Sequence, residues 1–149
     1  MADTLIRGTT IIEDKRVGSG TIWSIPGVAF TTRQPQTDAV VKDTLTGFIR
    51  ADTDNIELMV SVNLPQGVTV TKVIVYGNAG AIAGITWTLF RVDRIGGTSV
   101  TMATAAVGTE DTSIGDAIID NSGFSYMIAM GVNEFDNTDE IYGARIVFE

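Results

Sequence analysis

Apolar and polar residues alternate along the segment 56–64 of the chain. One face of the segment carries Ile56, Leu58, Val60, Val62 and Leu64. The other face carries Glu57, Met59, Ser61 and Asn63. A period of two is the signature of a half-buried β-strand. Because a Pro-Gln-Gly sequence follows at 65–67, the pattern predicts a strand that ends in a turn.

The same alternation returns at residues 124–132, and further apolar or β-branched runs lie between and after these two segments. They predict strands at 68–76, 85–92, 99–107, 117–120 and 141–148. The segment 99–107 also fits a short helix, and its Thr and Val content favours a strand. The small-residue stretch 77–84 and the acidic stretch 133–140 are interpreted as loops.

The first 50 residues are less regular, and we expect short strands there at 9–12, 28–32 and 39–42. The chain shows no amphipathic helix of three turns. About seven to ten short strands separated by turns are typical of an antiparallel sandwich or barrel. We therefore predict an all-β fold, a single antiparallel β-sandwich of the jelly-roll kind, with an immunoglobulin-like sandwich as the alternative.

A chain of 149 residues is expected to form one domain. Within it we expect residues 1–55 to supply an extended N-terminal arm and the first strands. Residues 56–149 are expected to form the main β-sandwich. No secretory signal is visible at the start of the sequence.

Composition excludes several kinds of chemistry. The chain has no cysteine and no histidine, so a disulfide framework, a Cys-based zinc site and a Ser-His-Asp triad are all excluded. We expect no enzyme. The formal charge is −8 and the ten basic residues are scattered, which disfavours both nucleic acid and anionic membranes as partners.

Two acidic loops offer carboxylates to a cation. Asp52 and Asp54 lie in one of them, and Asp136 and Asp139 in the other. Calcium takes six to eight oxygen ligands, so these four residues are its candidate ligands. The spacing does not match an EF-hand, and the competing interpretation is that Asp and Asn simply form solvated turns. We expect no other cofactor.

Two tryptophans are candidates for stacking on a sugar ring, namely Trp23 and Trp87. Aromatic residues at strand spacing are more often part of the core, and this is the stronger interpretation of Trp87. Trp23 is the better candidate because it lies in an irregular stretch between Gly20 and Pro26.

The N-terminal stretch carries apolar residues without a clear sheet of its own. Leu5, Ile6, Ile11 and Ile12 form a candidate assembly arm. Such a segment is able to pair with the sheet edge of a neighbouring subunit, or to form ordinary edge strands of its own domain. Only three lysines are present, so edge strands here have little of the charge that normally guards against association.

Several turn-and-strand sequences carry a resemblance to a known group of proteins. They are LPQGVTVTKV at 64–73, WTLFRV at 87–92, IDNS at 119–122 followed by FSY at 124–126, and IYGARI at 141–146. Together they resemble β-sandwich, jelly-roll-like structural domains of bacteriophage and other viral particle proteins. The resemblance covers about residues 56–149 and implies a structural or attachment role without catalytic residues.

These observations lead us to expect a non-enzymatic, self-assembling structural protein, most simply a virion component such as a capsid, decoration or tail subunit. Its partners would be copies of itself, as a homo-oligomer, or other particle proteins, and its location the virion or an extracellular surface. Two alternatives remain open. One is a carbohydrate-binding or lectin-like module with a glycan as its partner, and the other is an extracellular filament subunit assembled by strand exchange.

Overall fold

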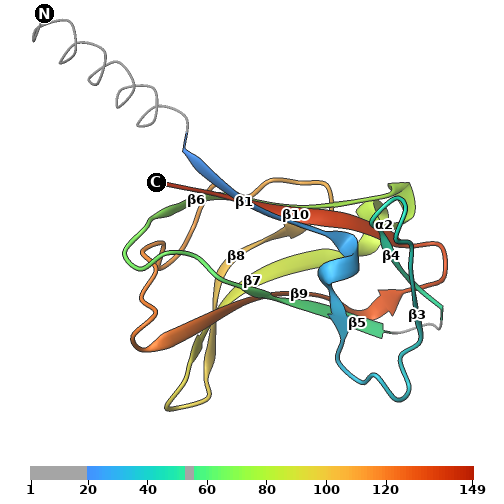
Figure 1. Ribbon diagram of the computed structural model, residues 1–149, viewed down its shortest axis with the longest axis horizontal. Helices are drawn as coiled ribbons and strands as arrows, with labels where there is room; N and C mark the ends of the chain where they lie inside the picture. The colour runs from blue at the N-terminus through green and yellow to red at the C-terminus, as the bar shows by residue number, and fades with distance from the viewer. Residues whose placement is uncertain (1–19, 53–55) are drawn as a thin grey trace, which may run out of the picture.

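The computed structural model describes residues 20–52 and 56–149. They form two antiparallel β-sheets that pack face to face. In Figure 1, β6, β1 and β10 run along the top of the molecule, and β8, β7, β9 and β5 lie below them. The predicted all-β sandwich of the jelly-roll kind is confirmed.

The first layer, called sheet A here, is built around the last strand. Its members are β1 (Thr21–Pro26), β3 (Val40–Lys42), β4 (Ile49–Ala51), β6 (Val70–Gly77) and β10 (Glu140–Phe148). β10 pairs with β1 along one edge and with β6 along the other, while its first residues pair with β4. The first described strand and the last strand therefore lie side by side.

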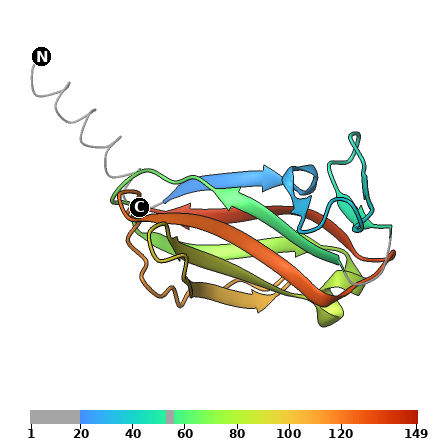
Figure 2. The ribbon, with the colours of Figure 1, turned by 90° about the horizontal axis from the view of Figure 1, so that it is seen from below.

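The second layer, sheet B, follows the order β2-β5-β9-β7-β8. Its members are β2 (Thr31–Thr32), β5 (Ile56–Val62), β7 (Thr86–Asp93), β8 (Ser99–Ala106) and β9 (Phe124–Phe135). Figure 2 looks at this layer from below, with β9 in orange between β5 and β7. Every strand of sheet B thus presents one face to this side of the molecule.

The core lies between the two sheets and is entirely apolar at its centre. Its largest fully buried side chains are Trp87, Phe30, Phe135, Ile49, Ile56, Leu58, Ile85, Leu89, Ile119, Ile128, Ile141 and Ile146. The alternation of the sequence explains this, because every second residue of β5 and β9 points inward. The intervening residues are left to form the outer faces.

The long connection between β8 and β9 closes one open side of the sandwich. Asp111 and Val73 exchange two backbone hydrogen bonds, and the amide of Gly115 donates to the carbonyl of Met102 at 2.7 Å. The connection therefore bonds to β6 of sheet A and to β8 of sheet B. Part of the edge of each sheet is covered in this way.

Most predicted strands are confirmed, with bounds that differ by one to three residues. Other predictions are wrong. The stretch 133–140 is only partly a loop, because β9 extends to Phe135 and β10 begins at Glu140. The segment 77–84 contains a short helix, α2 (Ala79–Gly84), because the side chain of Asn78 accepts a hydrogen bond from the amide of Ala81 and caps it. The segment 117–120 forms no strand and makes a single bridge, between Ile118 and Thr69.

Residues 20–52 contribute to both sheets, and two of their strands, β1 and β4, were not anticipated. The expected strand at 28–32 is a 3₁₀ turn, η1 (Gly27–Ala29), followed by β2. The expected strand at 9–12 lies outside the described residues. No helix in the described part of the chain is long and apolar enough to cross a membrane.

Candidate functional site

The outward side chains of sheet B line up in rows across its strands. One row joins Thr31, Met59, Ala129, Thr88 and Thr104. The next joins Ser61, Met127, Phe90 and Thr101. These nine residues are called the sheet B face below, and Figure 2 shows the side of the molecule on which they lie.

The sheet B face has an apolar centre and a polar rim. Met59, Phe90 and Met127 are half-buried, whereas Ser61 and Thr101 are exposed at its edge. All the polar residues of the two rows are hydroxyl-bearing, and none of the nine is charged. Such a surface is able to contact C–H groups through its centre and hydroxyl groups through its rim.

Internal hydrogen bonds hold part of the rim in place. The hydroxyl oxygens of Thr88 and Thr104 lie 3.1 Å apart, and the Thr104 hydroxyl also donates to the carbonyl of Trp87 at 2.9 Å. Beyond the rows, Arg33 and Glu57 form an ion pair at 3.0 Å. These two charged side chains therefore neutralise each other.

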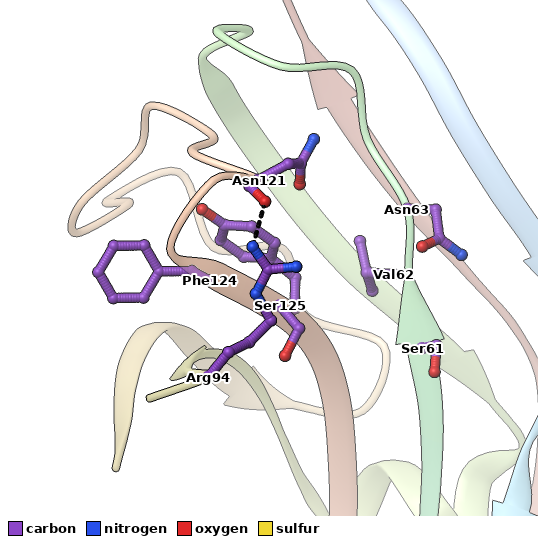
Figure 3. A pocket seen from close by; sticks show the side chains of 8 residues that line it. Ser61, Val62, Asn63, Arg94, Asn121, Phe124 and Ser125 are labelled. Carbon is purple, nitrogen blue, oxygen red and sulfur yellow. Dashed lines mark hydrogen bonds between the residues drawn. The ribbon is translucent and has the colours of Figure 1, made fainter. Parts of the chain in front are cut away.

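A hollow of about 300 Å³ opens at the other end of the face. It is lined by Ser61, Val62, Asn63, Arg94, Asn121, Phe124, Ser125 and Tyr126. Figure 3 shows Ser61 and Asn63 on one side of it and Arg94, Ser125 and Asn121 on the other. Ser61 belongs to both the hollow and the sheet B face, so the two surfaces are continuous.

The turn at residues 120–123 is held firmly against the hollow. The guanidinium of Arg94 donates to the carbonyl of Asn121 at 2.6 Å and also to that of Ser122. The side-chain amide of Asn121 donates to the carbonyl of Leu64 at 2.9 Å. The end of β7, the turn and the end of β5 are thereby tied together, so that the hollow is preformed.

The two aromatic residues at the hollow make contacts within the protein. The phenol oxygen of Tyr126 accepts a hydrogen bond from the amide of Asp120 at 2.8 Å. In Figure 3 the ring of Phe124 points away from Ser61 and Asn63. The guanidinium of Arg91 lies over this ring, 4.3 Å from its centroid, and Arg91 also pairs with Asp116 at 3.1 Å. The lining of the hollow combines amide, hydroxyl and guanidinium groups with the apolar Val62.

The described residues that line the hollow include no carboxylate. The adjacent Asp120 is occupied by the turn, since its carboxylate accepts hydrogen bonds from the hydroxyl and the amide of Ser122. These bonds lower the pKa of Asp120 below its usual value. The arrangement offers hydrogen bonds to a ligand.

The two tryptophans singled out from the sequence have different positions. Trp87 is fully buried, and its indole N–H donates to the carbonyls of Ala106 and Thr109 at 3.1 and 3.2 Å. It therefore has no face open to a ligand. Trp23 is half-buried on the edge strand β1 and packs against the core. Neither lies on the sheet B face.

Three of the four candidate calcium ligands lie within the described residues. Asp52 is exposed at the end of β4, and Asp54 lies outside the described residues. Asp136 and Asp139 share one loop, where Asp139 accepts a hydrogen bond from the amide of Asp136 at 2.8 Å. Residues 20–52 and 56–149 contain no group of three or more acidic side chains placed to hold a metal ion.

The proposed assembly arm, Leu5, Ile6, Ile11 and Ile12, lies outside the described residues. The site residues that sequence reasoning missed are Phe90, Arg94, Asn121 and Met127. Alternation along β5 already separated Met59 and Ser61 from the buried positions. The missed residues come to lie beside Met59 and Ser61 through the pairing register of β5, β9 and β7. No local sequence pattern specifies that register.

Searches with protein-family models and against curated proteins found no match. The fold does match solved structures. A low-affinity xylan-binding module, CBM86, from Roseburia intestinalis has a TM-score of 0.52 at 10% identity, covering 87% of this chain and 97% of its own. A family 35 carbohydrate-binding module from Clostridium thermocellum has a TM-score of 0.51 at 10% identity, covering 85% and 97%.

A third match is the C-terminal CBM6 of a laminarinase from Zobellia galactanivorans, with a TM-score of 0.50 and 10% identity over 85% of this chain and 99% of its own. At this identity the likeness shows the fold. All three are named as binding modules, which agrees with the prediction that the chain is not an enzyme.

The predicted resemblance to bacteriophage and viral particle proteins is wrong, because these solved structures of the same fold are carbohydrate-binding modules. The expectation of a self-assembling virion component, located in a virion, is wrong for the same reason. The expectation that its partners are copies of itself or other particle proteins is wrong as well. The quoted sequences encode turns and strands and specify no particular binding surface.

Proposed function

We propose that this protein binds a neutral polysaccharide on the sheet B face, as a carbohydrate-binding module without catalytic activity. The observation that carries the proposal is the chemistry of the two rows. Met59, Phe90 and Met127 form an apolar centre, hydroxyl-bearing residues surround it, and no charge lies in either row. A pyranose ring has the matching character, with apolar C–H faces and a rim of hydroxyl groups.

The hollow would take one end of the bound segment. The carboxamide of Asn63 and the hydroxyls of Ser61 and Ser125 line it, and both kinds of group donate and accept hydrogen bonds. Arg94 is fixed by its two backbone carbonyl partners and adds a donor of defined direction. Since the described lining has no carboxylate, the site suits a ligand with hydroxyl groups better than a cationic one.

The fold supports the same proposal. The solved structures with this fold include a module described as binding xylan. A protein that binds such polymers works where the polymers are, and we therefore place this chain at an extracellular surface.

The test introduces charge at two exposed positions of the face. Isothermal titration calorimetry compares the wild type with Ser61→Asp/Thr104→Asp, using soluble neutral polysaccharides such as xylan and mixed-linkage glucan. Leu45→Ala is the matched control, because Leu45 is 95% exposed and lies away from sheet B. The proposal predicts full binding by the wild type and the control and reduced binding by the double variant. Equal binding by all three proteins contradicts it.

A further inference from the structure

Two exposed tyrosines lie on the opposite side of the molecule, on the outer face of sheet A. Tyr76 belongs to β6 and Tyr142 to β10, and their side chains are 38% and 46% exposed. The inner face of sheet A is the buried core, so exposed side chains of this size point outward. They are the two exposed aromatic residues of the described chain.

An irregularity in β10 brings the two tyrosines together. Ile141 pairs with Gly77 and Gly143 pairs with Tyr76, so Tyr142 is an extra residue opposite Tyr76. Such a β-bulge leaves two residues of one strand facing a single residue of the other. Both tyrosines therefore lie at the same position along the paired strands β6 and β10.

Gly143 fixes this arrangement. A Cβ atom at this position would lie 2.4 Å from the carbonyl oxygen of Ile25, because β1 passes close beside β10. Only glycine allows that approach, and Gly143 also pairs with Pro26 in the register. The bulge that presents Tyr142 is thus built into the contact between the first and last strands.

The charges around the pair largely cancel. Lys72 and Arg145 both face Glu110, at 3.8 and 4.0 Å. Arg50 lies opposite Glu140 in the register of β4 and β10. Three basic and two acidic groups leave a small net charge, so this surface has no strong preference for a polyanion or a polycation.

We propose that Tyr76 and Tyr142 form a second contact site for a neutral polysaccharide, in which sugar rings stack on the two phenol rings. The class of ligand rests on the function proposed above, and the site is new. Aromatic faces are electron-rich and attract the C–H groups of a sugar ring. The phenol hydroxyls donate and accept hydrogen bonds at its rim, and the carboxylate of Glu140 accepts them. The balanced charge favours an uncharged polymer as the occupant.

The consequence is a module with two contact surfaces on opposite faces of the sandwich. One molecule would then contact two polysaccharide chains, or two segments of a folded one. Binding to an insoluble polymer would gain from both contacts at once, in excess of the affinity of either.

The test compares three proteins with the wild type: Tyr76→Ala/Tyr142→Ala, the same positions changed to Phe, and the sheet B variant Ser61→Asp/Thr104→Asp. Calorimetry with a soluble neutral oligosaccharide gives stoichiometry, and sedimentation with insoluble xylan gives overall retention. We expect two ligands per wild-type molecule and one per alanine variant. We expect retention to fall about 2- to 10-fold in the alanine variant and to be restored in the phenylalanine variant.

The outcomes separate the two proposals. Unchanged stoichiometry and retention in the alanine variant, with loss of binding in the sheet B variant, overturn the second site and leave the proposed function standing. Loss in the alanine variant with normal binding by the sheet B variant overturns the proposed function and supports the tyrosine site. A wild-type dimer that becomes monomeric in the alanine variant, by analytical ultracentrifugation, overturns the glycan assignment in favour of a second copy of the chain.

Discussion

The guanidinium of Arg94 donates a hydrogen bond to the carbonyl oxygen of Asn121 at 2.6 Å. This bond joins the end of β7 to the turn that precedes β9, at the rim of the hollow. The same guanidinium also holds the carbonyl of Ser122. A single side chain thus positions the turn whose residues line the candidate site.

Arg94→Ala is therefore expected to weaken glycan binding more than it weakens the fold. Losing a charged donor to exposed carbonyls costs about 1 kcal/mol of the free energy of unfolding, because water replaces the donor. Binding should fall because the turn at 120–123 loses its fixed position. Urea unfolding and calorimetry measure the two effects. Arg94→Ala with full affinity would show that the turn does not position the ligand.

Trp87→Phe tests the assignment of Trp87 to the core. The change removes the indole N–H that serves Ala106 and Thr109, and it leaves both carbonyls without this donor. We expect a loss of about 1–3 kcal/mol in the free energy of unfolding and unchanged affinity for glycan in the folded protein. Chemical denaturation and calorimetry at low temperature check this. A selective loss of affinity in a stable variant would place Trp87 at the ligand.

Acid is expected to destabilise the protein through its turn-forming aspartates. Asp43 accepts hydrogen bonds from the amides of Leu45 and Thr46, and Asp93 does the same for Ile95 and Gly96. These bonds lower the pKa of each carboxyl in the folded state below the usual 3.8. A lowered folded pKa contributes stability above the unfolded pKa, and that stability is lost as the pH falls through the folded pKa.

The measurement is the urea midpoint at pH 5 and pH 2.5 for the wild type and for Asp43→Asn/Asp93→Asn. The wild type should lose stability at pH 2.5, and the variant should lose less, since it no longer has these two carboxylates to protonate. An equal loss in both proteins would show that other groups cause the acid sensitivity.

The stability contributed by Asp139 should change with pH in the direction opposite to that of Asp43 and Asp93. Its side chain is buried, with a residue exposure of 5%, and burial raises its pKa above 3.8. The backbone amide of Asp136 donates to it, which offsets only part of that rise. A raised folded pKa contributes stability below the unfolded pKa that is lost as the pH rises through the folded pKa.

Asp139→Asn keeps an acceptor for the amide of Asp136 and removes the buried charge. We therefore expect a higher Tm than the wild type at pH 7 and a smaller difference near pH 3. Differential scanning calorimetry at the two pH values checks the sign. A lower Tm for the variant at pH 7 would mean that the charge of Asp139 stabilises its loop.

The sequence predicted the sandwich well because alternation is a local property. Ile56, Leu58 and Val62 are buried along β5 and Val60 is half-buried, while Met59 and Ser61 on the other face point outward as expected. Short strands such as β4 are too brief to show a period. α2 is fixed by one capping side chain, Asn78, and by burial of Ala81, which are visible only once the fold is known.

The candidate site was predicted only in part, since it depends on pairing between distant segments. Phe90 lies beside Met127 because β7 and β9 pair in one register, and a shift of one strand by one residue would turn its outward side chains inward. Tyr142 lies opposite Tyr76 because of a β-bulge, and no sequence pattern predicts this bulge. The chosen tryptophans were prominent in the sequence, and packing placed one in the core and the other against it.

The most direct test of the central claim is a titration of the ¹⁵N-labelled protein with a soluble neutral xylo- or gluco-oligosaccharide, followed by amide chemical shifts. The account predicts that the largest shifts cluster on the sheet B face and around the hollow, at Met59, Ser61, Asn63, Phe90, Asn121, Ser125, Met127 and Ala129, with a weaker second set at Tyr76 and Tyr142. The account is contradicted if saturating oligosaccharide shifts none of these amides, or shifts only amides remote from both faces.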